Sequence, residues 1–248
     1  MPSSYKIRKL INPFVGDAFN PASVPELPAI RQVLARAFSG GEIEAFSLLV
    51  IDFECIITPA AFVAVATGHD PDDPDTSYVG PFYEASVIAA LVGGGEVYIA
   101  ETDETEKEIV GCAVWFGPGH SIYDSEAQRK YALSPFMERL SEEQREWWQL
   151  EFVPKFRELV KNNLGDGTKH NAWHLQTLGI DPAHRRKGLA KALMQDVIAK
   201  STGVLKCLEF GTETSNLKIY QKIGWKQAEY SVDFNSRRGK CGMGVMTM

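Results

Sequence analysis

A run of three cations, Arg185 to Lys187, leads into Gly188 at the point where an apolar helical pattern begins. The N-terminus of a helix presents backbone N–H groups that have no partner within the helix, together with the positive end of the helix dipole. Because glycine has no Cβ, an anion can approach its backbone closely, and nearby cations add attraction. This combination predicts a phosphate-binding turn.

The segments around this turn must position it. We predict a strand over residues 172–181, the turn over 182–188, and a helix over 189–200, in which Leu189, Leu193 and Val197 share one face. Pro182 fixes the turn and places the helix start at the carboxyl end of the strand, where ligands of α/β sheets usually bind. A second strand over 204–213, a short helix over 215–225 and a terminal strand over 241–248 complete the alternating pattern.

The N-terminal half shows a sparser pattern. It predicts a strand at 5–11, a helix at 25–38, and two strands within 93–119 that are joined by an acidic turn. The acidic, proline-rich run 70–77 is interpreted as a solvated loop or a mobile lid. Gly93 to Gly95 do not form a dinucleotide-binding motif, because no G-x-G-x-x-G follows a strand and opens a helix there.

Residues 121–163 are predicted to be helical and charged, with a turn-rich break at 164–171. Pro154 is expected to kink or split this helical segment. One apolar face has two interpretations, core packing or the wall of a substrate pocket; it is formed by Trp148, Phe152, Phe156 and Leu159.

Composition limits the function classes. The chain has 248 residues, of which 44% are hydrophobic and 23% charged, as in soluble globular proteins. Its net charge of −6 argues against a nucleic-acid binder and mildly favours a cationic substrate. The four cysteines have no metal-ligand spacing, so we expect no metal, and their dispersal fits a reducing compartment.

The segment 46–66 is long enough to cross a membrane, but Asp52 and Glu54 would each cost roughly 2.5–3.5 kcal/mol at a helix centre. Because Pro59 also interrupts it, we interpret the segment as a buried or substrate-facing helix and expect no membrane association. The N-terminus lacks an apolar signal region. We therefore expect a cytoplasmic protein, with a nuclear location also open.

The order LGID-P-x(4)-KGLA, a helix, and then LEFGTETSNLKIYQKIGW resembles the coenzyme-binding core of the GNAT superfamily of N-acetyltransferases, over about residues 172–225. The chain is similar to fungal-type members without an assigned substrate. The resemblance implies one α/β domain over residues 1–248, with a mixed, mostly antiparallel sheet flanked by helices and splayed beside the phosphate turn. A helical insert at about 121–163 precedes the core. It also implies acetyl-CoA as the donor and direct transfer to an amine in a ternary complex.

The resemblance also implies roles for individual residues. Backbone groups of Leu178, Gly179 and Ile180 would pair with the pantetheine arm, and the Ile180 N–H would polarise the thioester carbonyl. Asn216 would bind the pantetheine region, and Tyr220 would protonate the departing thiolate. The pyrophosphate would be held by Arg185, Arg186, Lys187, Gly188, Leu189 and Ala190.

The general base is open between two residues. An alkyl ammonium has a pKa of about 10.4 and must lose a proton before it attacks. Gln176 stands where histone-acetylating relatives carry a glutamate, and it cannot act as a base. His174 corresponds to a histidine of arylalkylamine-acetylating relatives, so it is interpreted either as the base or as a hydrogen-bonded core residue. Glu209 on the neighbouring strand is the second candidate.

The sequence therefore predicts an N-acetyltransferase that acts on a primary amine, with a small-molecule amine preferred over a protein. Two alternatives stay open within the same fold: a protein N-acetyltransferase, and a catalytically silent module that binds acyl-CoA. A nucleotide-dependent enzyme using the same phosphate turn is a third. The identity of the amine, the acyl-chain length and the oligomeric state are not determined by the sequence.

Overall fold

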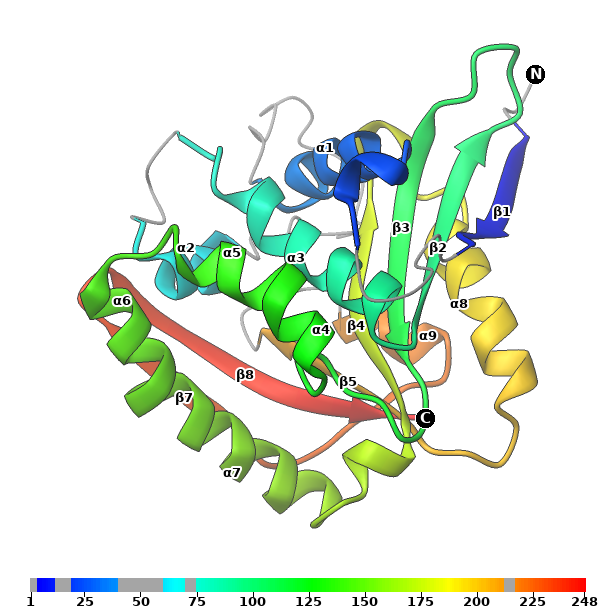
Figure 1. Cartoon of the computed structure of the whole chain (residues 1–248). Coiled ribbons are helices and arrows are strands. Elements are labelled where there is room, and N and C mark those ends of the chain that lie inside the picture. Colours follow the sequence, from blue (N-terminus) through cyan, green and yellow to red (C-terminus); the bar gives the residue numbers. More distant parts are fainter. Residues whose placement is uncertain (1–3, 12–18, 40–59, 70–74, 212–216) are drawn as a thin grey trace, which may run out of the picture.

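The computed structural model describes residues 4–11, 19–39, 60–69, 75–211 and 217–248 (Figure 1). Eight strands of this described part form one sheet: β1 (Tyr5–Lys9), β2 (Gly95–Thr102), β3 (Ile109–Phe116), β4 (Trp173–Ile180), β5 (Lys206–Gly211), β6 (Lys226–Gln227), β7 (Val232–Ser236) and β8 (Gly239–Thr247). Their order is β1-β2-β3-β4-β5-β8-β6, with β7 paired to β8. All these pairs are antiparallel except β4 with β5. The expected mixed, mostly antiparallel sheet flanked by helices is confirmed.

Helices cover both faces of this sheet. Their bounds are α1 (Leu27–Phe38), α2 (Ala60–Thr67), α3 (Val79–Val92), α4 (Glu126–Gln128), α5 (Ser134–Met137), α6 (Glu142–Trp147), α7 (Val153–Leu164), α8 (Leu189–Lys200) and α9 (Leu217–Lys222). The strand, turn and helix predicted over 172–200 are confirmed, and so is the terminal strand. Helix α3 and strand β7 were not predicted.

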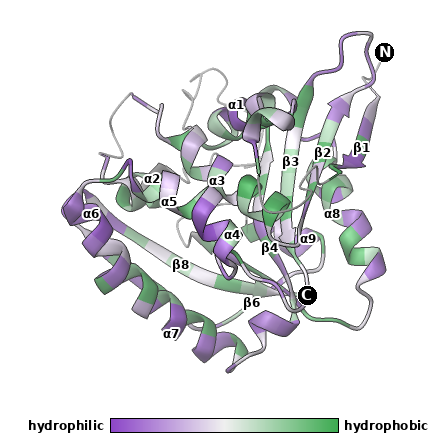
Figure 2. Ribbon diagram, viewed as in Figure 1, coloured by the Kyte–Doolittle hydropathy of each residue, from purple (hydrophilic) through white to green (hydrophobic). Residues whose placement is uncertain are grey.

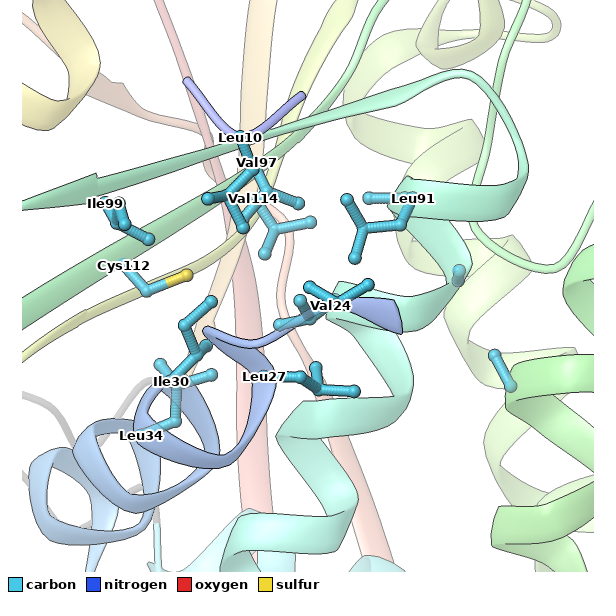
Figure 3. Close-up of a cluster of buried hydrophobic side chains, with 14 of the residues drawn as sticks. Leu10, Val24, Leu27, Ile30, Leu34, Leu91, Val97, Ile99, Cys112 and Val114 are labelled. Carbon is cyan, nitrogen blue, oxygen red and sulfur yellow. The ribbon is translucent and has the colours of Figure 1, made fainter. Parts of the chain in front are cut away.

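The alternation of side chains along β2 and β3 divides the core in two, because successive residues of a strand point to opposite faces. On one face, Ile99 and Cys112 pack against α1 and α3 (Figure 3). On the other face, Tyr98 and Ala113 pack against α8, whose predicted apolar stripe is buried. Strand β3 is buried at every position because helices cover it on both sides.

The glycine run 93–95, whose last residue begins β2, is explained by close packing and by backbone conformation. A Cβ at Gly95 would lie 2.7 Å from the Cα atom of Ala90 in α3, so glycine allows the helix to approach the strand closely. Gly94 has a φ of +79°, which favours glycine at this turn. These residues serve the α3–β2 connection.

The helical segment before β4 departs from regular α-helical geometry just before Pro154. The helix is not split there: α6 continues into α7 through a π-helical turn at residues 148–152, where the Val153 N–H donates to the Trp148 carbonyl five residues earlier. A wider turn accommodates a residue that lacks the N–H for the regular α-helical bond. The run then ends at Gly165, and Figure 2 shows α7 with hydrophobic residues interspersed among hydrophilic ones.

Several sequence features lie wholly or partly outside the described residues: Cys55, most of the segment 46–66, most of the loop 70–77, and Asn216. Within the described residues, Cys112 and Cys207 are buried thiols. No helix of that part of the chain is long and apolar enough to cross a membrane. The same part contains no cluster of three or more residues arranged to hold a metal ion.

Candidate functional site

The site begins where β4 separates from β5. The two parallel strands pair only at Trp173 with Lys206 and at His174 with Cys207, and beyond this point they diverge. The predicted splay of the sheet is therefore present. It opens a V-shaped gap whose sides are the remaining residues of β4 and β5.

The edge of β4 that faces this gap carries free backbone groups. The Asp181 N–H donates to the Val110 carbonyl on β3 at 2.9 Å, and Gly179 pairs with Cys112 on the same side. In an antiparallel ladder, alternate residues direct their N–H and C=O groups to opposite edges. The backbone groups of Leu178 and Ile180 therefore point toward the gap, where β5 is not paired to them.

The cationic turn follows directly after β4. Gly188 has a φ of +79° at the N-cap of α8 and supplies no side-chain cap, and Arg186 is also left-handed at +61°. A Cβ placed on Gly188 would meet no atom within 4 Å, so the space before the helix is open. Among the hydrogen bonds of the described residues, the N–H groups of Arg186, Lys187 and Gly188 have no acceptor. Unpaired donors, open space and the helix dipole meet there, which suits an anion.

The three cations of the turn have different surroundings. Arg185 donates to the Ala37 carbonyl at 2.9 Å, so it ties the turn to the C-terminal end of α1. Burial lowers the pKa of Arg185, with Asp181 opposing the shift. The Lys187 Nζ lies 5.6 Å from the ring centre of Tyr5. Arg186 is exposed, which leaves it and Lys187 as the cations best placed to meet an anion from solvent.

A cavity of about 720 Å³ occupies the gap between the diverging strands. Leu178 and Gln176 of β4, Glu209 of β5, and Tyr220 of α9 line it on the sheet side. Trp148, Phe152 and Phe156 line it from the helical segment. Of the two interpretations of this aromatic face, the pocket wall therefore applies to these three residues, whereas Leu159 is fully buried core.

Tyr220 lies on α9 at the cavity, and its ring packs edge-on against Trp225 at 6.2 Å between centroids. Its hydroxyl has no hydrogen-bond partner among the described residues. Burial raises the pKa of Tyr220 to about 12, so the phenol keeps its proton at neutral pH. Tyr83, a second tyrosine that lines the cavity, stacks on Phe38 at 3.9 Å between centroids.

A buried polar group of three residues closes the narrow end of the gap. Glu209 accepts a bond of 2.5 Å from His174 Nε2 and one of 2.6 Å from Lys169 Nζ. His174 is only 3% exposed and does not line the cavity, and its Nδ1 has no partner among the described residues. Because the carboxylate is an acceptor, Nε2 carries the proton of the neutral imidazole.

The charge states of this group follow from burial and contact. Burial would raise the pKa of Glu209, but its hydrogen bonds with His174 and Lys169, together with the charge of Lys169, lower it well below its usual range. Burial lowers the pKa of His174, although the neighbouring Glu209 opposes the shift. At neutral pH an ionised Glu209 therefore accepts a hydrogen bond from a neutral His174.

Of the predicted residues, Leu178, Glu209 and Tyr220 line the cavity together, whereas Ile180 and the turn do not line it and lie further along the chain, at and after the end of β4. His174 lies behind Glu209, and Asn216 is outside the described residues. Gly179 has a packing role as well, since a Cβ there would lie 2.7 Å from Leu34 of α1. Lys169 was missed because it stands in a turn-rich break and carries no sequence motif.

The model of the Acetyltransferase (GNAT) family matches residues 64–225, more than half of the chain. No curated protein matches by sequence. A polyamine N-acetyltransferase from Drosophila melanogaster is similar in structure, with a TM-score of 0.53, 12% identity, and 99% of each chain covered.

Two further solved structures are similar. A mutant agmatine N-acetyltransferase in its apo form has a TM-score of 0.50 at 12% identity, covering 98% of this chain and 99% of its own. A protein from Corynebacterium glutamicum, described as histone acetyltransferase HPA2 and related acetyltransferase, has a TM-score of 0.49 at 17% identity, covering 100% of this chain and 96% of its own. At these identities the likeness concerns the fold.

The buried histidine predicts a pH dependence of stability. A group whose pKa is lowered by folding contributes stability above its unfolded pKa, about 6.5 for histidine, and loses it as pH falls. We expect the free energy of unfolding to decrease between about pH 7 and pH 5, and His174→Gln to flatten this decrease. Urea unfolding of both proteins at the two pH values measures it. The same slope in His174→Gln as in the native chain would contradict the assignment.

Proposed function

Since the chain belongs to the Acetyltransferase (GNAT) family and is thus an acyltransferase, we propose that it transfers the acetyl group of acetyl-CoA to a primary amine, with both substrates bound together. The observation that carries the proposal is the open gap between β4 and β5, which ends at a turn with unpaired backbone donors. A thioester in the gap and a pyrophosphate at the turn would use these two features at once.

The coenzyme fits the groups that are present. The pyrophosphate would accept from the backbone of the turn and from the first turn of α8, with Arg186 and Lys187 adding charge. The free N–H and C=O groups of Leu178 and Ile180 suit the amide-bearing pantetheine arm, which would extend β4 in the manner of an added strand. The Ile180 N–H would then donate to the thioester carbonyl as negative charge develops on its oxygen.

In the chemical step, the neutral amine nitrogen attacks the thioester carbon, the C–N bond forms, and the C–S bond breaks. Tyr220 faces the cavity with an uncommitted hydroxyl and donates to the departing sulfur. A phenol with a pKa of about 12 holds its proton more firmly than a thiol with a pKa near ~8.5. Hydrogen bonding to the developing thiolate is therefore the main effect of Tyr220. The proton that the nitrogen releases balances the one that the thiol gains.

The amine must reach this step without its extra proton. With a pKa of about 10.4, roughly one alkyl amine in 2,500 is neutral at pH 7. Transfer into an apolar cavity favours the neutral form, because burial penalises charge. Glu209 lines the cavity and is ionised, so it attracts the ammonium and can take its proton through a water molecule. His174 supports Glu209 from behind by its hydrogen bond.

A small amine suits the site better than a protein segment, because the acceptor side of the cavity is bounded by aromatic side chains of α3, α5 and the turn before α7. The silent binding module keeps one argument in its favour: a carboxylate with so low a pKa as Glu209 is a weak base. An N-acetyltransferase requires the Tyr220 hydroxyl for turnover, whereas a silent acyl-CoA-binding module has no turnover that the hydroxyl could affect.

Tyr220→Phe removes the proposed donor without removing its ring. We expect kcat to fall about 10²- to 10³-fold, because a single hydrogen-bond donor aimed at charge that develops in the transition state typically contributes that much. The rate of thiol release from acetyl-CoA with a reactive amine measures it, and the affinity for CoA by calorimetry should stay unchanged. Tyr83→Phe is the control, and it should keep most of the activity. An unchanged rate in Tyr220→Phe would remove this residue from the mechanism.

Gly188→Ala tests the phosphate turn, and the chain supplies a matched control at the other end of α8. Gly188 and Gly203 both have a φ of +79°, and a Cβ on either would meet no atom within 4 Å. Both alanine variants should therefore lose a similar stability, about 1–2 kcal/mol from backbone strain.

Only Gly188→Ala should weaken CoA binding, by about tenfold or more, because its methyl group enters the space assigned to the pyrophosphate. Calorimetry with CoA, ATP and NAD measures it. Equal CoA affinity in the two variants would contradict the placement, and tighter binding of ATP or NAD than of CoA would favour a nucleotide-dependent enzyme.

A further inference from the structure

The cavity has one wall built almost wholly of aromatic rings. Five of them contact in a closed circuit, from Phe62 to Phe82, Phe136, Trp148, Phe152 and back to Phe62, with centroid separations between 4.5 and 6.0 Å. We call these five residues the aromatic wall. They come from α2, α3, α5 and the π-helical turn before α7, so segments far apart in the sequence build one apolar surface.

Charge in the cavity is confined to two side chains of the described lining. Glu209 is its one carboxylate and Arg157 its one cation. Glu209 already contacts Lys169 and His174, and it lies on β5, whereas the aromatic wall comes from helices and the turn before α7. A single amino group of a ligand therefore finds an anion at this end, whereas the far end offers none among the described residues.

Aromatic faces can also bind cations, so the rings could in principle hold the second charge of a dicationic amine. The Phe156 ring, next to the aromatic wall, already carries Lys169 Nζ at 4.5 Å from its centre. Arg157 at the same helix adds repulsion toward a second cation. A ligand with a second charge far from its reacting amine would lose its hydration against the aromatic wall, whose five side chains carry no anion to replace that hydration, which is costly.

Resting on the proposed function, we propose that the acceptor is a hydrophobic primary monoamine. Its amino group lies between Glu209 and the thioester, and its apolar body, of the size of an aromatic ring, packs on the aromatic wall. Dicationic amines such as agmatine, and polyamines such as spermidine, are poor substrates by the same reasoning.

The test compares kcat/KM for thiol release from acetyl-CoA with 2-phenylethylamine, agmatine and spermidine. We expect 2-phenylethylamine to exceed either multiply charged amine by at least about tenfold, because the unpaired charge must be desolvated. A preference for agmatine or spermidine would overturn the inference and leave the proposed acetyl transfer intact. Hexanoyl-CoA used several-fold better than acetyl-CoA would also overturn it, since the wall would then hold the acyl chain.

Gln149→Glu provides a variant that changes charge with little change of shape. Gln149 is exposed and lines the cavity on the helical side. A carboxylate there adds a second anion to the described lining, which could pair with the second charge of a dicationic amine. We expect kcat/KM for agmatine, relative to 2-phenylethylamine, to rise roughly two- to fivefold, the range of an exposed ion pair. No change in this ratio would show that the far end of the cavity does not meet the substrate.

A binding measurement distinguishes a wrong assignment of the acceptor class from a wrong assignment of acetyl transfer. Calorimetric titration of 2-phenylethylamine into the CoA-bound protein should show uptake. Uptake without any thiol release from acetyl-CoA would overturn the proposed catalysis and support the choice of ligand class. Absence of uptake, with agmatine bound instead, would overturn the ligand class alone.

Discussion

The separation of β4 from β5 is the constraint on which the rest of the site depends. Two parallel strands that pair at only two positions leave the following backbone groups of β4 without a partner on one edge. Buried backbone donors and acceptors are expensive to leave unpaired, so a fold that keeps such an edge open is suited to a ligand that completes it. The cavity, the exposed edge of Leu178 and Ile180, and the access of Glu209 and Tyr220 all follow from this divergence.

Polar contacts hold the two sides of the gap in place. At its narrow end, Lys169 and His174 both bond to Glu209, so β4, β5 and the turn before β4 are tied together. At its open end, Arg36 pairs with Asp181 at 2.6 Å and Arg185 bonds to α1. Arg36 and Arg185 therefore stabilise the fold around the turn, whereas Arg186 and Lys187 remain available to an anion.

The sequence predicted β4, the turn after it and α8 correctly, since local signals fix these elements. Gly188 marks a left-handed N-cap, the stripe of Leu189, Leu193 and Val197 marks α8, and both act over a few residues. The acceptor half depends on long-range packing. The aromatic wall joins α2 to the segment before α7, and no local pattern relates Phe62 to Phe152. Pro154 indicated an irregular helix at this place, but its form, a π-helical turn over residues 148–152 instead of a split, is not revealed by sequence patterns.

In the proposed complex, backbone amides at the start of α8 and on the free edge of β4 receive the coenzyme. Amide hydrogen exchange, measured residue by residue with and without CoA, tests it most directly. We expect CoA to slow amide exchange at residues 186–191 and at Leu178 and Ile180, while the exchange rates of amides on β7 and β8 stay unchanged. Slowed exchange elsewhere on the chain, with no change at the turn before α8, would contradict it.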